Sequence, residues 1–459
     1  MKSKRPNILL ITVHDLGTRL GCYGAATVPS PRLDKFAADG VRFEHHYATA
    51  PYCSPSRGSI ITGQYPHVTG LMGLVNLGWQ WPPENHTLAK RLGAAGYQTY
   101  LFGLQHETEE DQVERLGFQH VTDRKASKTA QSVTPLVEDF LTRWDGDRPF
   151  YARVGFNEVH RTFDRYAPED PAKVSLPPHI EDTPGARQDV AMYDGCIREM
   201  DQHVGRILDA LDRAGLRQNT LVVFTNDHGS PMPGAKATLY DPGIHTTLLL
   251  RWPGPLPGGS TVPELISNVD LCPTLLEAAG VSAPDNIQGR SFLPLLTGGQ
   301  YTPRDVIFAE KNTTPIDVKR CIRTTRFKYI RNYHRGPRLM LSADTESSLT
   351  RRDMGNDHLA PRAPVELYDL ESDPLERSNR AGDAEYAGRE GQLAAILQQI
   401  QEETDDPILR GPIERPAVEA GVIQRVRDSI PERSHFSRDG LTGGWEAVQS
   451  GRYDERNDE

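Results

Sequence analysis

A short run in the first part of the chain combines a cysteine with a proline, an arginine and a helix-forming stretch. It reads Cys53-Ser54-Pro55-Ser56-Arg57-Gly58, and the short apolar turn 59–62 follows it. A thiolate is stabilised by a nearby cation and by the N-terminus of a helix, and Arg57 with this turn could supply both. Cys53 is therefore a candidate nucleophile, although a free cysteine is more often a small buried hydrophobic residue.

The wider motif resembles the signature of the formylglycine-dependent (type I) sulfatases of the alkaline-phosphatase-like superfamily. That signature is CxPSR followed four residues later by TG, and Cys53, Arg57 and Thr62-Gly63 match it. The resemblance implies that a formylglycine-generating enzyme oxidises Cys53 to an aldehyde, formylglycine (3-oxoalanine). One hydroxyl of the hydrated aldehyde would attack sulfur and give a covalent sulfo-enzyme intermediate, and the other would expel sulfate by re-forming the carbonyl.

Two pairs of an acidic residue and a histidine lie far apart in the sequence, each directly after an expected strand. They are His14-Asp15 and Asp227-His228. Hydrogen-bonding loop residues would explain either pair alone. The sulfatase resemblance implies that Asp15, Asp227 and His228 hold a divalent metal beside Cys53, with calcium as the family's usual ion. His14 replaces an acid of the family pattern, and imidazole suits manganese or zinc better than calcium, so the metal stays open.

Further residues match positions that handle sulfate in the same family. His106 ends the short element GLQH, and the resemblance implies that it takes the proton that lets sulfate leave. His160 matches a histidine that binds sulfate near the leaving group, and Lys236 matches a lysine that contacts the departing oxygen. Arg57 would position formylglycine through its rigid fork of donors. A surface histidine and a solvated lysine are the simpler explanations of His160 and Lys236.

Two departures from the family pattern change the charge of the site in opposite directions. His14 removes the negative charge of an acid, and Leu104 removes the positive charge of the lysine that the family carries in GKxH. An ammonium contact at about 4 Å is worth up to roughly 4 kcal/mol near a protein surface. The hypothesis is that the two changes together preserve the net charge of the site.

The expected elements bring these residues to one edge of a sheet. Short apolar runs that predict strands alternate with helical patterns, which predicts an α/β fold with a large mixed, mostly parallel sheet flanked by helices. Ligands bind beyond the carboxyl ends of such strands, where His14, His106 and Asp227 are expected. The predicted strands are 8–13, 97–102, 150–156, 221–225 and 247–251, and the predicted helices are 31–38, 87–95, 133–144 and 190–214.

Changes in composition and in the pattern of expected elements along the chain predict two domains and a C-terminal extension. We expect a catalytic domain over 1–300, a smaller C-terminal α+β domain over 301–409 and a polar C-terminal extension over 410–459. The extension is charged and has little apolar periodicity, so it is expected to wrap the surface or to form a subunit contact, which leaves a homo-oligomer open. In the second domain, the predicted strands are 306–309, 320–324, 328–331 and 366–369, and the predicted helix is 388–403.

Composition limits the partners of the protein. A net charge of -10 argues against a nucleic-acid partner, because such binding needs clustered Lys and Arg. No stretch approaches the roughly 18 apolar residues of a membrane span, so no membrane partner is expected. The sequence has no CxxC pair, which favours a reducing compartment. We therefore expect a cytoplasmic enzyme with a small anionic sulfated substrate. The cysteines are Cys22, Cys53, Cys196, Cys272 and Cys321.

Three functions are compatible with the resemblance. Loops at 70–74 and 229–233 are similar to the heparan N-sulfatase (sulfamidase) branch, which favours hydrolysis of a sulfate ester or a sulfamate, with a sugar as one carrier. The first alternative is a phosphonate monoester or phosphate diester hydrolase that uses the same aldehyde, although His106 and the complete CSPSR motif favour sulfate. The second is a non-catalytic binding protein on a sulfatase scaffold, which the intact motif at Cys53 disfavours.

Overall fold

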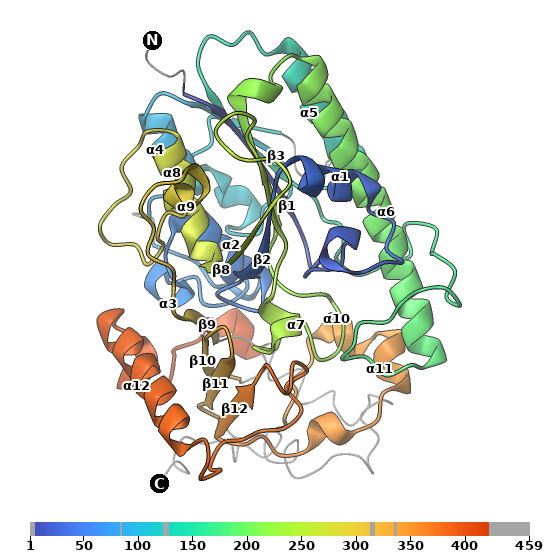
Figure 1. Cartoon of the computed structure of the whole chain (residues 1–459), viewed down its shortest axis with the longest axis vertical. Coiled ribbons are helices and arrows are strands. Elements are labelled where there is room, and N and C mark those ends of the chain that lie inside the picture. The colour runs from blue at the N-terminus through green and yellow to red at the C-terminus, as the bar shows by residue number, and fades with distance from the viewer. Residues whose placement is uncertain (1–4, 83–84, 123–127, 313–316, 335–336, 422–459) are drawn as a thin grey trace.

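A computed structural model gives the structure of the protein and describes residues 5–82, 85–122, 128–312, 317–334 and 337–421. The described chain forms two β-sheets with helices packed against them, and the larger sheet lies above the smaller one in Figure 1. Most of the extension predicted over 410–459 lies outside the described residues. Among the described helices, none is both long enough and apolar enough to cross a membrane.

The larger sheet has eight strands in the order β4-β3-β5-β1-β6-β7-β2-β8. Only β7 runs antiparallel to its neighbours, β6 and β2, so the predicted large, mixed and mostly parallel sheet is confirmed. The sequence did not mark β2, which carries charged residues, or the two edge strands, β8, which contains a proline, and the two-residue β4. The strands are β1 Asn7–Val13, β2 Val41–Tyr47, β3 Gln98–Gly103, β4 His120–Val121, β5 Phe150–Gly155, β6 Thr220–Asn226, β7 Leu248–Arg251 and β8 Ser260–Ser267.

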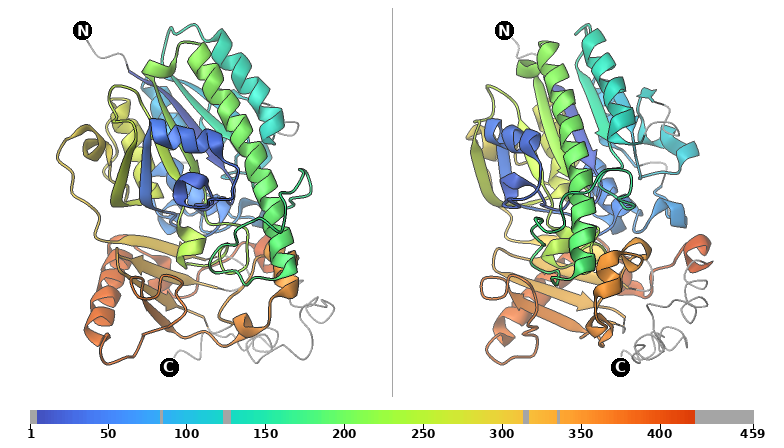
Figure 2. Two further views of the ribbon diagram at one scale, coloured as in Figure 1. Left: turned by 45° about the vertical axis from the view of Figure 1, so that its right-hand side comes forward. Right: turned by 90° about the vertical axis from the view of Figure 1, so that its right-hand side faces the viewer.

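Strand β1 lies in the middle of this sheet and is buried on both faces. Successive side chains of a strand point to opposite faces. Leu9 and Ile11 accordingly join the core that α5 and α6 cover, whereas Ile8 and Leu10 join the core under α2, α4 and α8. Helices α5 and α6 run beside each other on one side of the sheet (Figure 2). Helices on both faces explain why the apolar run of β1 has no polar alternation.

Helices of the larger part begin and end at recognisable residues. The longest, α6, begins after Thr183, whose hydroxyl accepts a hydrogen bond from the Ala186 amide, and Pro184 occupies its first turn. The helices are α1 Pro31–Asp39, α2 Cys53–Thr62, α3 Pro66–Thr69, α4 Leu88–Ala94, α5 Ala130–Arg143, α6 Pro184–Arg213, α7 Asp241–Ile244, α8 Leu271–Ala278 and α9 Leu293–Thr297. Short 3₁₀ turns lie at Gly21–Tyr23, Val75–Leu77, Glu110–Leu116, Arg217–Asn219, Asn268–Asp270, Asp357–Leu359 and Pro407–Arg410.

The smaller sheet has four antiparallel strands in the order β12-β11-β10-β9, and α12 packs against it. This confirms the smaller C-terminal α+β part. The chain between β11 and β12 leaves the small sheet, and its helix α11 packs on α6 (Figure 1). The elements are β9 Ile307–Lys311, β10 Lys319–Arg323, β11 Phe327–Asn332, β12 Val365–Asp369, α10 Ala343–Glu346, α11 Leu349–Asp353 and α12 Ala387–Glu403.

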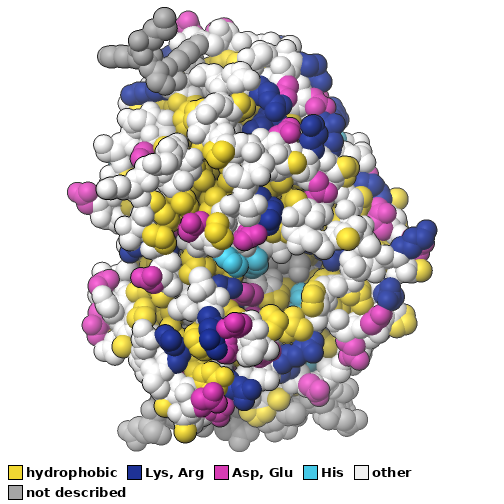
Figure 3. Space-filling model, in the orientation of Figure 1, with side chains coloured by type: hydrophobic (Ala, Val, Ile, Leu, Met, Phe, Trp, Pro, Cys, Tyr) yellow, Lys and Arg dark blue, Asp and Glu magenta, His cyan; other side chains and the backbone are white. Residues whose placement is uncertain are grey.

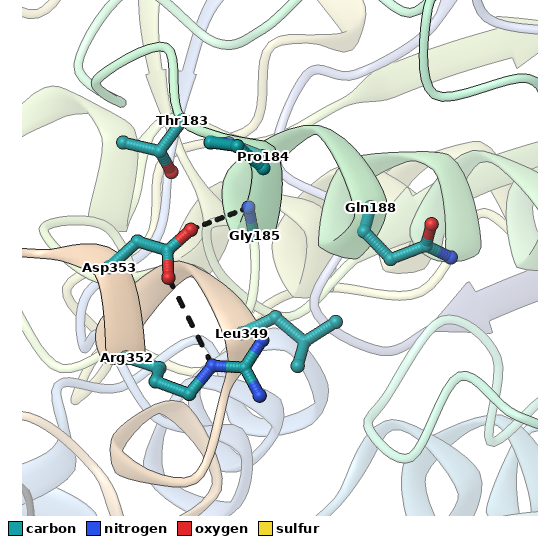
Figure 4. A pocket seen from close by; sticks show the side chains of 7 residues that line it. All are labelled: Thr183, Pro184, Gly185, Gln188, Leu349, Arg352 and Asp353. Atoms are coloured by element: carbon teal, nitrogen blue, oxygen red, sulfur yellow. Dashed lines mark hydrogen bonds and ion pairs between the residues drawn. The ribbon is translucent and has the colours of Figure 1, made fainter.

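A cavity of about 570 Å³ marks the seam where α11 meets the start of α6 (Figure 4). Asp353 crosses the seam and accepts a hydrogen bond from the Gly185 amide at 2.6 Å, which satisfies an amide at the start of α6. Thr183, Gln188 and Leu349 complete much of its wall. None of the predicted site residues lines this cavity, so the candidate chemistry lies elsewhere.

Candidate active site

The ends of two neighbouring parallel strands bring the two predicted metal-binding pairs together. Val13 of β1 is in register with Asn226 of β6, so the residues that follow each strand lie side by side. The Asp15 amide donates a hydrogen bond to Asp227 Oδ1 at 2.9 Å. His14 Nδ1 lies 3.1 Å from Asp227 Oδ2. Sheet topology alone therefore assembles this part of the site.

The backbone at Asp15 adopts an unusual conformation that its neighbours hold in place. Its φ is 51°, in the left-handed region that non-glycine residues seldom adopt. The Tyr193 hydroxyl, from α6, donates to the Asp15 carbonyl at 2.7 Å, and the Gly17 amide donates to the His228 carbonyl at 3.1 Å. Strain of this kind persists where surrounding contacts determine the conformation, often at functional sites.

Helix α2 places Cys53 at its first position, against the two strand ends. One turn later, the Arg57 Nε donates to Asp227 Oδ2 at 2.9 Å, and its Nη2 donates to the Val13 carbonyl at 3.0 Å. These bonds join α2 to both β1 and β6. Cys53 Sγ consequently lies 3.4 Å from His228 Nε2. The cysteine is buried and lies beside the predicted metal ligands.

The donor atoms of this cluster suit a divalent metal. One ligand atom each from His14, Asp15, Cys53 and Asp227 lies within 4.8 Å of all the others. Among the described atoms, His14 Nδ1 and Asp15 Oδ1 are buried and make no hydrogen bond. His228 Nδ1 lies 3.0 Å from the Gly229 carbonyl, so in the neutral ring Nδ1 carries the proton that it donates to this carbonyl. The other ring nitrogen, Nε2, then has a free lone pair, and this atom lies 3.0 Å from Asp15 Oδ1. When both imidazoles are neutral, these nitrogen and oxygen lone pairs converge on one point, as a bound cation requires.

The electrostatics of the cluster lead to the same expectation. Burial raises the pKa of Asp227, but the charges of His228, Arg57 and His14 hold it well below its usual range. Burial lowers the pKa of His14, and Asp227, Cys53 and Asp15 outweigh it, which raises that pKa to about 10. Protons on the imidazoles thus balance the carboxylates. A divalent metal would supply the same positive charge through the same nitrogen lone pairs.

The thiol of Cys53 is strongly acidified in this environment. Burial and Asp227 raise the pKa of Cys53, but His14, Lys236 and His228 offset them and hold it well below its usual range. The position at the start of α2 acts in the same direction. A sulfur in this place is therefore chemically exceptional among the five cysteines, which are all free.

A second group of residues lies beside this cluster and surrounds Lys236. Its Nζ donates to Asp15 Oδ2 at 2.7 Å and to Asp344 Oδ2 at 2.9 Å, and it lies 3.2 Å from His160 Nε2. His160 Nδ1 lies 2.5 Å from the Arg161 carbonyl, which assigns the proton to Nδ1 and leaves Nε2 to accept from Lys236. Burial lowers the pKa of Lys236, but Asp15 and Asp344 raise it well above its usual value.

His106 reaches the same region from the end of β3. Its ring centroid is 5.9 Å from that of His14, and its Nδ1 is buried without a hydrogen-bond partner among the described atoms. Leu104 is also buried and brings no charge to the site. The structure thus brings together every predicted site residue, namely His14, Asp15, Cys53, Arg57, His106, His160, Asp227, His228 and Lys236. Their individual roles stay predictions.

Two sets of residues recur below and are defined here. The cation half comprises His14, Asp15, Cys53, Asp227 and His228, all of which are buried. The leaving-group half, named after the role predicted for Lys236, comprises His160, Lys236 and Asp344, of which His160 and Asp344 are partly exposed. The face drawn in Figure 3 is hollowed between the two parts of the molecule, with histidine and acidic side chains near the hollow.

Sequence reasoning missed two contributors to the site. Asp344, in α10, pairs with Lys236 from more than a hundred residues away, and no motif surrounds it in the sequence. Tyr193 lies inside a long amphipathic helix, where a buried aromatic residue is ordinary. An acidic residue in a polar loop and a tyrosine in a helix carry no distinguishing signal, and only tertiary packing reveals them.

Comparison with known families gives two matches along the chain. A family model described as Sulfatase matches residues 6–281. A second, described as N-sulphoglucosamine sulphohydrolase, C-terminal, matches residues 235–345. The first match covers the cation half, and the second contains Lys236 and Asp344.

Individual proteins similar to the chain have related descriptions. An ulvan-active sulfatase of Formosa agariphila is 29% identical over 84% of this chain and 73% of its own length. The human N-sulphoglucosamine sulphohydrolase is 28% identical over 90% of this chain and 93% of its own length. A solved structure of BT4656 with its substrate D-glucosamine-2-N,6-O-disulfate has a TM-score of 0.70 at 22% identity, and it covers 89% of this chain and 99% of that one. At that identity the structural likeness concerns the fold.

Proposed function

Because the chain belongs to the sulfatase family, whose model matches more than half of it, we propose that it hydrolyses a sulfamate or sulfate ester of an amino sugar. The observation that carries the proposal is the position of Cys53. Its sulfur lies at the start of α2, 3.4 Å from His228 Nε2 and beside the buried carboxylates of the cation half. The matched N-sulphoglucosamine sulphohydrolase model and the 28% identical human relative support an amino-sugar substrate.

Cys53 is, in this proposal, the precursor of formylglycine, made by a formylglycine-generating enzyme. The family match and the intact motif support this assignment. The hydrated aldehyde supplies a hydroxyl nucleophile for sulfur and a second hydroxyl for release of sulfate. Arg57 fixes this position, because its guanidinium joins α2 to Asp227 and to the end of β1.

The cation half would hold one divalent metal through Asp15, Asp227 and the two imidazoles of His14 and His228. Such an ion polarises a nucleophile and neutralises sulfate oxygens. Calcium follows from the family resemblance, whereas nitrogen donors favour manganese or zinc. His14 Nδ1 is buried beside Asp227 and makes no hydrogen bond among the described atoms, which supports a nitrogen-binding metal.

The leaving-group half and His106 handle protons. Within the part of the chain that the structure describes, His106 Nδ1 makes no hydrogen bond and lies near the cation half, where it accepts the proton that is released as the sulfur intermediate breaks down. Lys236 is protonated because Asp15 and Asp344 surround it, so it can donate its proton to the oxygen or nitrogen that departs from sulfur. His160 accepts from Lys236 and orients it.

The alternative phosphonate or phosphate diester hydrolase is not favoured. A phosphonate monoester hydrolase from Silicibacter pomeroyi shares the fold, with a TM-score of 0.67 at 22% identity, 87% of this chain covered and 96% of that one. That likeness concerns the fold, whereas the C-terminal family match is to a sulphohydrolase. The cytoplasmic location, expected from the cysteines, and a homo-oligomer stay predictions that cell fractionation and solution mass would check.

A substrate panel tests the proposed function. The full-length protein, co-expressed with a formylglycine-generating enzyme, would be given N-sulfoglucosamine, glucosamine 6-sulfate, an aryl sulfate and an aryl phosphonate with one metal at a time. We expect sulfate release from at least one of the two sugar derivatives, and none from Cys53→Ala protein. Turnover of the phosphonate alone would show that the alternative is right. If protein that carries the aldehyde hydrolysed none of the four compounds, the result would favour the non-catalytic binding protein.

A further inference from the structure

The ammonium group of Lys236 has all of its hydrogen-bond donors in use. A lysine ammonium carries three N–H donors. Asp15 accepts one at 2.7 Å, Asp344 accepts one at 2.9 Å, and His160 Nε2 lies at 3.2 Å as the third acceptor. A substrate atom that approaches Lys236 therefore meets one of these acceptors as well.

Exposure shows which acceptor the substrate meets. The Asp15 side chain is 0% exposed, whereas the Asp344 side chain is 22% exposed and that of His160 is 30% exposed. Lys236 bridges Asp15, which belongs to the cation half, and Asp344, and an oxygen of each carboxylate lies within 4.8 Å of the other. The open side of Lys236 is bounded by Asp344 and His160. A substrate whose sulfo group faced the predicted metal ligands would place the group that leaves from sulfur on this more exposed side.

The segment that carries Asp344 is anchored to the catalytic part at a second point. Thr350, in α11, donates its hydroxyl to Asp189 Oδ2 at 2.7 Å. Asp189, in α6, also accepts two hydrogen bonds from Arg161, the neighbour of His160, at 2.7 and 2.6 Å. This connection fixes α11, and with it α10, relative to the leaving-group half. A side chain held in this way is preorganised for recognition.

Sulfamates and sulfate esters differ at the atom that leaves. The bridging nitrogen of a sulfamate carries an N–H that donates a hydrogen bond, whereas the bridging oxygen of an ester only accepts. An ionised carboxylate only accepts hydrogen bonds. It therefore complements the sulfamate N–H and leaves the ester oxygen without a donor.

We propose that Asp344 is a specificity-determining residue that accepts a hydrogen bond from the bridging N–H of a sulfamate and so selects sulfamates over sulfate esters. This rests on the proposed function and names the substrate class within it. A site that hydrogen-bonds a particular N–H discriminates against the analogue that lacks it, because its polar group is then unpaired. The carboxylate comes from the C-terminal part of the chain, so substrate choice is added to the catalytic part by the smaller one.

The test compares two substrates in two variants of the full-length mature enzyme. Asp344→Ala removes the acceptor, and Asp344→Asn keeps a neutral carbonyl acceptor. We expect Asp344→Ala to lower kcat/KM for N-sulfoglucosamine on the order of 10- to 100-fold relative to an aryl sulfate, the range of a hydrogen bond to a charged group. Asp344→Asn should lower this relative kcat/KM by a smaller factor, because its amide carbonyl still accepts a hydrogen bond. Asp357→Asn, at an exposed carboxylate of the 3₁₀ turn Asp357–Leu359, is the matched control and should leave the ratio unchanged.

Binding provides a second readout that needs no turnover. Dissociation constants of N-sulfoglucosamine and glucosamine 6-sulfate would be measured for Cys53→Ala protein with and without Asp344→Ala. A loss of affinity for N-sulfoglucosamine alone supports the proposal. An equal loss of affinity for both compounds would overturn it, because Asp344 would then only support Lys236. The proposal would also be overturned if Asp344→Ala left the ratio of the two dissociation constants unchanged, or if the protein that retains Asp344 did not bind N-sulfoglucosamine. Failure of the proposed function is distinct, because the wild-type enzyme would then release no sulfate from any compound.

Discussion

The two halves of the active site are built in different ways. The cation half follows two adjacent strand ends and the start of α2, and its side chains are 0–3% exposed. The leaving-group half combines a loop after β5, a loop after β6 and α10 from the C-terminal part, and two of its side chains are 22–30% exposed. The first half has its geometry fixed by the sheet. The second is assembled by packing between distant segments, so we expect changes there to alter substrate choice without loss of the chemistry.

The largest effect is expected from Arg57→Ala in the cation half. Arg57 is buried and pairs with Asp227, and removal of one partner of a buried pair leaves the other charge uncompensated, which costs about 3–5 kcal/mol. Denaturant unfolding would measure the loss. Arg143→Ala is the control, because Arg143 pairs with Asp139 at the surface, both side chains are more than half exposed, and the change should leave the unfolding midpoint nearly unchanged. Equal losses in the two variants would contradict the contrast between a buried and an exposed ion pair.

Asp227→Asn should abolish metal binding with less damage to the fold. The amide keeps the shape but removes the charge that Arg57 and His14 share, so we expect less than one divalent metal per chain and activity lower on the order of 10²- to 10³-fold. Elemental analysis of the purified protein and sulfate release would measure both. Asp209→Asn, on the exposed face of α6, should change neither. Full metal content in Asp227→Asn would contradict the assignment of the cation half.

A double-mutant cycle tests whether His14 and Leu104 compensate each other. His14→Asp would add a third carboxylate at the position from which His14 Nδ1 now lies 3.1 Å from Asp227 Oδ2, and Leu104→Lys would add the matching positive charge. We expect each single change to lower activity, and the pair to recover on the order of 0.5–3 kcal/mol of coupling in kcat/KM. His14→Asp should also shift metal preference toward calcium. Simple additivity of the two effects would refute charge compensation.

The smallest effect is expected from Thr350→Val in the anchor of the leaving-group half. Loss of its hydrogen bond to Asp189 removes about 0.5–1.5 kcal/mol, which corresponds to a few-fold to roughly tenfold decrease in kcat/KM for a sulfamate. Thr142→Val, whose hydroxyl bonds only within α5, is the control. An effect confined to stability, with kinetics unchanged, would show that the anchor does not position Asp344.

The contrast between the cation half and the leaving-group half also explains which parts of the fold and the site could be predicted from the sequence. Buried central strands such as β1 and β6 are continuous apolar runs, so their ends, and the residues that follow them, were predicted. Family motifs supplied Cys53, His106, His160 and Lys236. Strand β2 was missed because its charged residues interrupt the apolar pattern. Asp344 was missed because its position depends on how α11 packs against α6, which no local pattern encodes.

The central claim is that the chemistry begins at an aldehyde derived from Cys53. The most direct measurement is the mass of the peptide that contains Cys53, taken alongside sulfate release, across preparations with different amounts of the formylglycine-generating enzyme. We predict that activity rises in proportion to the fraction of peptide carrying the aldehyde and is absent when the thiol is unmodified. Sulfate release by protein in which every Cys53 is still a thiol would contradict the account.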